Sequence, residues 1–108
     1  MLKALFAYSF QPQSVPAESI QPIINELALI DEHVTANAPE WPLSQINRVD
    51  LAVLRLAIFE LTHSPVPPKV VIDEAVELGK EFGSGSSAKF INGVLGNFLK
   101  NKDAVANQ

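Results

Sequence analysis

The sequence predicts an all-α fold: one bundle of about four full helices, preceded by a short N-terminal helical stub. Three observations support this fold class. Asn47–Leu61 is the longest nearly continuous apolar run, and it contains no Gly or Pro. Elsewhere, apolar residues recur at intervals of three and four, which is the spacing of one helix face. No stretch alternates apolar and polar residues for long enough to predict a strand.

Length and composition limit the possible classes of protein. The chain has 108 residues, of which 47% are hydrophobic, enough for one small domain with a modest core. It has no cysteine, which excludes disulfides and thiolate metal sites. No apolar run reaches the ~20 residues of a membrane span, so we expect no membrane segment. The absence of cysteine is compatible with the cytoplasmic location that we expect. The net charge of −4 argues against nucleic-acid binding, because nucleic-acid binders are usually basic at least locally.

The first half of the chain predicts a stub, a linker and two helices. Residues 2–10 are rich in aromatic residues and form the stub, and Gln11–Pro16, with two prolines, is the linker. A full helix is expected from Ala17 to about Ala38. Pro22 lies near its start, where proline is tolerated. The central helix is expected from about Leu43 to His63.

The second half predicts two more helices. One runs from Lys69 to Phe82, with Pro68 in its first turn and Gly83 at its end. The last runs from about Ser87 to Lys100. The expected core face of the first of these helices is Ile72, Ala75, Val76, Gly79 and Phe82. We expect a single domain over residues 1–108: stub and linker at 1–16, bundle at 17–100, and a frayed polar tail at 101–108.

One residue of the central helix does not follow its pattern. At 100° per residue, Ser44, Arg48, Arg55 and Thr62 form a narrow polar stripe, and the rest is almost entirely apolar. Asp50 lies about 200° from Arg48, on the side that should be buried. Two interpretations are open: a carboxylate paired with a lysine or capping a backbone group, or an open side that receives a partner.

The last helix carries an unusual face. Lys89, Gly93, Gly96 and Lys100 lie opposite its core side. Each glycine inside a helix costs about 1 kcal/mol relative to alanine. In one interpretation, this bare strip lets a phosphate backbone or another helix approach closely. In the other, the glycines are the result of neutral drift, or they face a helix of the same domain. Phe90, at the edge of the core face, either stacks on an unpaired base or closes over the core rim.

Catalysis has little support in this sequence. His33 and His63 are isolated histidines without a spaced partner. The serines at 86 and 87 lack the G-x-S-x-G elbow of a hydrolase, and GSGSS lacks the G-x-x-x-x-G-K-[ST] phosphate loop. The glutamates of the 69–82 helix fit a solvated face better than a metal site. We therefore expect no enzyme, no metal and no cofactor.

Three stretches together carry a more specific pattern: INRVDLAVLRLAIFEL (Ile46–Leu61), VPPKVVIDEAVELGKEFG (Val66–Gly83) and SSAKFINGVLGNFL (Ser86–Leu99). In their order, their helix-PP-helix-G-S-helix layout and the KF-x-NGVL motif, they resemble the NusB family of bacterial transcription antitermination factors. The resemblance is specific over Trp41–Leu99 and weaker over Ala17–Glu40. Lys3–Phe10 is similar to the end of the family's first helix.

The resemblance implies a NusB-like fold of two small helical subdomains. It also implies a heterodimer with a small-subunit ribosomal protein (NusE), and binding of boxA-type single-stranded RNA by that pair within the transcription elongation complex. The function would be suppression of premature termination, notably in ribosomal RNA operons. Carried over by position, the implied RNA contacts are Lys3, Lys89, Phe90, Asn92 and Gly93, and the implied protein contacts are Phe6, Tyr8 and Asp50.

One departure from the family opens alternatives. The family's first helix begins with an arginine-rich RNA-binding segment, whereas this sequence begins at Met1-Leu2-Lys3. Either the true start lies upstream, or this is a reduced member that serves as a protein-interaction module with weak RNA affinity. Homodimerisation through Phe6, Tyr8 and Phe10 is a further possibility. A related domain precedes an RNA cytosine methyltransferase, but no Gly-rich cofactor-binding fold follows here, so we do not expect that enzyme.

Overall fold

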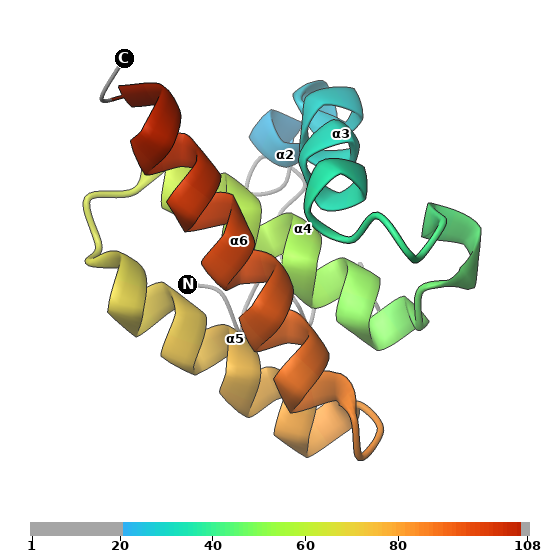
Figure 1. The fold of residues 1–108 in the computed structure, drawn as a ribbon. Helices are drawn as coiled ribbons and strands as arrows, with labels where there is room; N and C mark the ends of the chain where they lie inside the picture. The colour runs from blue at the N-terminus through green and yellow to red at the C-terminus, as the bar shows by residue number, and fades with distance from the viewer. Residues whose placement is uncertain (1–20, 107–108) are drawn as a thin grey trace.

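The computed structural model describes residues 21–106, with side chains as far as Lys102 (Figure 1). Its elements are α2 (Gln21–Asn25), α3 (Leu27–Asn37), the 3-10 turn η3 (Leu43–Gln45), α4 (Arg48–His63), α5 (Pro68–Phe82) and α6 (Ser87–Ala106). Residues 21–106 contain no strand, which confirms the predicted all-α class. The predicted stub and linker lie outside the described residues. Within 21–106, no helix is long and apolar enough to cross a membrane.

The predicted central helix is α4, and it is the core of the fold. Its apolar surface contacts α3, α5 and α6 (Figure 1). Val53, Leu54 and Ile58 are completely buried. The helix begins at Arg48 because the side chain of Asn47 caps it, accepting a hydrogen bond from the Val49 N–H at 2.8 Å. The sequence predicted that the central helix begins at about Leu43. In the structure, Leu43–Gln45 is instead a separate 3-10 turn that precedes α4.

Polar side chains join α4 to the N-terminal part of the fold. The guanidinium of Arg55 donates two hydrogen bonds to the Asp31 carboxylate of α3, at 2.8 and 3.0 Å. The Nε2 atom of His63 lies 2.8–2.9 Å from the carboxylate oxygens of Glu26. The polar stripe of α4 is thus partly an attachment surface for α3, and not simply a solvated face.

The helix predicted over 17–38 is interrupted at Glu26. The Glu26 N–H donates to the carbonyl of Ile23, three residues back, at 3.1 Å, and this tighter turn separates α2 from α3. One apolar face nevertheless continues through α2 and α3, since Ile23, Ile30 and Val34 are buried in the core.

The core face of α5 differs from the one expected. Its bounds, Pro68–Phe82, agree with the prediction that proline begins the helix and Gly83 follows it. The buried residues, however, are Val71, Ala75, Leu78 and Gly79. Phe82, expected in the core, is 52% exposed. Val71, Ala75 and Leu78, spaced by four and three residues, define the centre of the buried face. Ile72 and Val76, which were predicted to be in the core, are partly buried at its margin.

The last helix continues beyond its predicted end at Lys100, as far as Ala106. Two long-range hydrogen bonds hold the extension. The Asn101 amide donates to Asn37 Oδ1 at 2.8 Å, and Lys102 Nζ donates to the Leu61 carbonyl at 3.1 Å. The polar residues from Asn101 are thus helical as far as Ala106 and do not form the expected frayed tail over that range.

Two glycines of α6 have open space beside them, whereas one glycine of α5 is closely packed. A Cβ atom added at Gly93 or Gly96 would have nothing within 4 Å. Among the described residues, therefore, neither glycine faces another helix. A Cβ at Gly79 would lie 2.7 Å from Cδ1 of Ile91, so this glycine permits the close contact of α5 with α6.

Alanine substitution should separate these two kinds of glycine. We expect Gly93→Ala and Gly96→Ala each to raise the free energy of unfolding by about 0.5–1 kcal/mol, because alanine favours the helix and meets no neighbour. Gly79→Ala should bring a smaller gain than either, because the buried Ile91 side chain must move to admit the new methyl group. Urea denaturation monitored by circular dichroism measures all three. A loss of stability in Gly93→Ala would show that this face of α6 is packed.

Candidate functional site

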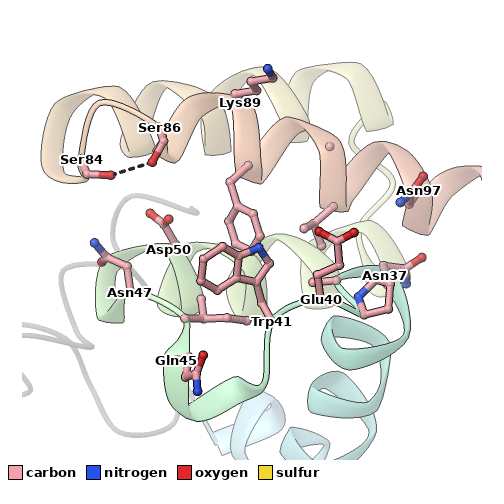
Figure 2. Close-up of a pocket in the computed structure, with 16 residues that line it drawn as sticks. Asn37, Glu40, Trp41, Gln45, Asn47, Asp50, Ser84, Ser86, Lys89 and Asn97 are labelled. Carbon is pink, nitrogen blue, oxygen red and sulfur yellow. Dashed lines mark hydrogen bonds between the residues drawn. The ribbon is translucent and has the colours of Figure 1, made fainter.

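A groove of about 740 Å³ lies between the outer part of α6, the first turn of α4 and the segment that follows α3 (Figure 2). Asp50, Lys89, Phe90 and Gly93 are among the residues that line it. The sequence resemblance had assigned Asp50 to a protein partner and the other three to RNA. The structure therefore brings residues expected to contact two different partners into one groove.

Asp50 is buried, and its Oδ1 atom has no hydrogen-bond partner among the described residues. It lies in the first turn of α4, where the helix dipole favours an anion. The residue is 5% exposed, and within residues 21–106 its Oδ1 atom accepts no hydrogen bond. Neither a lysine pair nor a backbone cap accounts for this carboxylate among the described residues. Because a buried polar atom without a partner is costly, Asp50 is suited to accept a hydrogen bond from a bound molecule.

The wall of the groove formed by α6 combines a lysine, an aromatic ring and a bare backbone. Lys89 is exposed, Phe90 is half-buried, and Gly93 is exposed. Phe90 both packs against the core and makes an edge-to-face contact with Trp41, with ring centroids 6.3 Å apart. Asn92, also expected to contact RNA, is exposed on α6 but does not line the groove.

Charge is distributed unevenly across the groove. The carboxylates of Asp50 and Glu40 lie on the side formed by α4 and the segment after α3, and the ammonium group of Lys89 lies on the α6 side (Figure 2). A phosphate is favoured beside Lys89 and disfavoured beside the two acids. A cationic or neutral group fits the acidic side.

Trp41 is a groove residue that sequence reasoning did not select. It lies between Pro39 and Pro42 in the turn after α3, and its side chain is 48% exposed. The sequence offers one signal, a single tryptophan flanked closely by prolines, but this signal does not indicate a groove. Its neighbour Phe90 is distant in the sequence, so the pair is formed by the tertiary fold.

Three predicted contacts, Lys3, Phe6 and Tyr8, lie outside the described residues and stay predictions. Among the described residues, no three His, Cys, Asp or Glu side chains are grouped so that they could hold a metal ion.

Comparison with known proteins shows the family to which the chain is similar. The profile of the NusB family matches residues 3–100. The chain is 49% identical over 87 residues to the transcription antitermination protein NusB of Dehalococcoides mccartyi strain CBDB1, an alignment that covers 80% of this chain and 61% of that protein. It is 40% identical over 85 residues to the protein of the same name from Macrococcus caseolyticus strain JCSC5402, covering 79% of this chain and 65% of that one.

A solved structure gives the same result for the fold. T. maritima NusB superposes with a TM-score of 0.76 at 31% identity, covering 92% of this chain and 84% of that chain. The chain spans about three fifths of the length of the curated relatives it matches. Those relatives are named as antitermination proteins and not as enzymes, in agreement with the expectation from sequence. Family profile, sequence identity and fold agree, and the chain belongs to the NusB family.

Proposed function

We propose that this chain is an RNA-binding transcription antitermination factor. In this proposal it acts in the cytoplasm with the small-subunit ribosomal protein NusE on boxA-type RNA of ribosomal RNA operons. The names of the relatives support the process, since they are called transcription antitermination proteins. The observation that carries the RNA side is the exposed, unpacked face of α6.

That face has the chemistry of a backbone-binding strip. Lys89 and Lys100 are exposed along it, and Gly93 and Gly96 lie between them in the sequence with open space where a Cβ atom would be. Because no packing among the described residues requires these glycines, their helix-propensity cost suggests a role in ligand approach. A ribose-phosphate backbone can lie close to such a surface while the lysines neutralise phosphates.

The groove beside the strip supports the protein side. Asp50 offers a buried carboxylate oxygen without a partner among the described residues. A cationic or hydrogen-bond-donating side chain of NusE would satisfy it. An RNA phosphate would not satisfy this oxygen, because the negative charges of the phosphate and the carboxylate repel each other.

A second candidate function is a protein-interaction module with weak RNA affinity. The net charge of −4 and the acidic side of the groove favour it. The two functions share the contact of Asp50 with NusE and differ only in whether the α6 strip binds RNA. A measurement of RNA binding therefore distinguishes the two candidate functions, whereas a measurement of complex formation with NusE does not.

Replacement of Lys89 tests the RNA side. We expect Lys89→Ala to weaken binding to a boxA-type RNA in the presence of NusE, and to reduce the slope of log K against log salt by about 0.7, the value for one lost phosphate contact on single-stranded nucleic acid. Fluorescence anisotropy over a salt series measures both quantities. Lys69→Ala is the matched control, since this exposed lysine lies at the start of α5 and pairs only weakly with Asp73, at 3.4 Å.

Equal losses in Lys89→Ala and Lys69→Ala would contradict a specific contact at Lys89. If the unmodified chain shows no salt-dependent RNA binding, with or without NusE, the second candidate replaces the first.

Replacement of Asp50 tests the protein side. Asp50→Asn keeps the size of the side chain but removes its charge, so we expect weaker binding to NusE by isothermal calorimetry. The free energy of unfolding should change by less than about 1 kcal/mol, because removing a buried charge without a hydrogen bond at Oδ1 is opposed by losing its favourable interaction with the helix dipole. Asp73→Asn, on the solvent face of α5, is the control. Unchanged NusE affinity in Asp50→Asn would mean that the interface lies elsewhere.

A further inference from the structure

Trp41 presents an aromatic surface at the middle of the groove. Figure 2 shows its indole between Asp50 and Asn47 on one side and Asn37 and Asn97 on the other. The ring meets Phe90 edge to face, with an interplanar angle of 75°. This contact braces the indole against α6, while 48% of the residue stays exposed. A braced and exposed indole face is suited to stacking.

Residues that line the groove offer groups that can contact the parts of a nucleotide. Lys89, which lines the groove from α6, can hold a phosphate. The exposed side chain of Asn97 also lines the groove and makes no hydrogen bond within the described part of the chain, so its amide can donate and accept. Asn37 is different, because its amide is already engaged with the His33 carbonyl and with Asn101. Two side-chain amides of the groove, those of Asn97 and Gln45, therefore make no hydrogen bond among the described residues.

Charge decides which part of a nucleotide can enter the groove. Asp50 and Glu40 disfavour a phosphate inside it, whereas a base is neutral. Lys89 and Gly93 belong both to the groove wall and to the exposed α6 strip, so the two surfaces are continuous. A backbone on the strip can thus turn a base inward. The volume of about 740 Å³ is in the usual range for small-ligand sites and is large enough for one base.

We propose that the Trp41–Phe90 pair is a base-recognition site, in which an unpaired RNA base stacks on the Trp41 indole and presents its edge to Asn97. This inference rests on the proposed RNA-binding function and adds to it a site that the family resemblance did not assign. It also gives Phe90 a supporting role, since its ring holds Trp41 in place. A bound protein side chain at the indole is the competing occupant and is an outcome of the test below.

Trp41 is the only tryptophan of the chain and therefore reports on its own site. A boxA-type RNA is titrated into the chain with NusE present, and tryptophan emission and RNA anisotropy are followed together. The same titration of Trp41→Phe is subtracted to remove emission from NusE. We expect saturable quenching of Trp41 that follows the anisotropy curve, because a stacked base quenches indole emission. An abasic oligomer of equal length should bind more weakly and leave the emission unchanged.

Substitutions supply the second measurement. Trp41→Leu should weaken RNA binding by about fivefold or more, and Trp41→Phe should retain most of the affinity because a ring remains. Both variants should fold, since Trp41 lies outside the core and, among the described residues, its one hydrogen bond runs from its backbone N–H to the Ala38 carbonyl. Circular dichroism checks this.

The possible results separate this inference from the function on which it rests. RNA binding with unchanged emission and full affinity in Trp41→Leu would overturn the base site and leave the proposed function intact. Quenching by NusE alone, with no further change on adding RNA, would assign the indole to the protein and overturn the base site. Equal quenching by the abasic oligomer would also overturn it. No RNA binding at all would overturn both.

Discussion

The packing of α4 against three other helices is the constraint on which this structure depends. Its side chains are apolar around most of the circumference, and Val53, Leu54 and Ile58 are fully buried. Such a helix is stable only if neighbours cover several of its sides at once. The pairs Arg55–Asp31 and His63–Glu26 then fix α3 against the same helix. The positions of α3, α5 and α6 are all consequences of covering α4.

The same constraint positions the candidate site. α6 uses Ile91, Val94 and Leu95 for the core, and its opposite face stays outside. The N-terminal end of α4 is defined by the Asn47 cap, which sets Asp50 at the first turn and beside the groove. Neither the bare strip of α6 nor the unpartnered oxygen of Asp50 is explained by packing among the described residues. The glycines lower the stability of the helix, and the buried oxygen lacks a hydrogen bond. We propose that a bound partner offsets both costs.

Local sequence patterns predict much of this arrangement, and long-range contacts account for the rest. The central helix, the Pro68 start and the exposed glycines of α6 follow from composition and periodicity. The extension of α6 depends on Asn101 meeting Asn37, which no local pattern contains. The contact of Trp41 with Phe90 is of the same kind. Sequence could therefore suggest Phe90 and Asp50 as separate candidates, but it could not show that they share a groove with Trp41.

The central claim is that the unpacked face of α6 binds RNA. Backbone amide chemical shifts of the ¹⁵N-labelled chain, recorded with NusE before and after addition of boxA-type RNA, test it most directly. We expect the largest changes at Gly93 and Gly96, while the buried Gly79 serves as an internal reference and stays unchanged. Changes concentrated on the exposed side of α5 around Asp73 and Glu77, with Gly93 and Gly96 unmoved, would contradict the account.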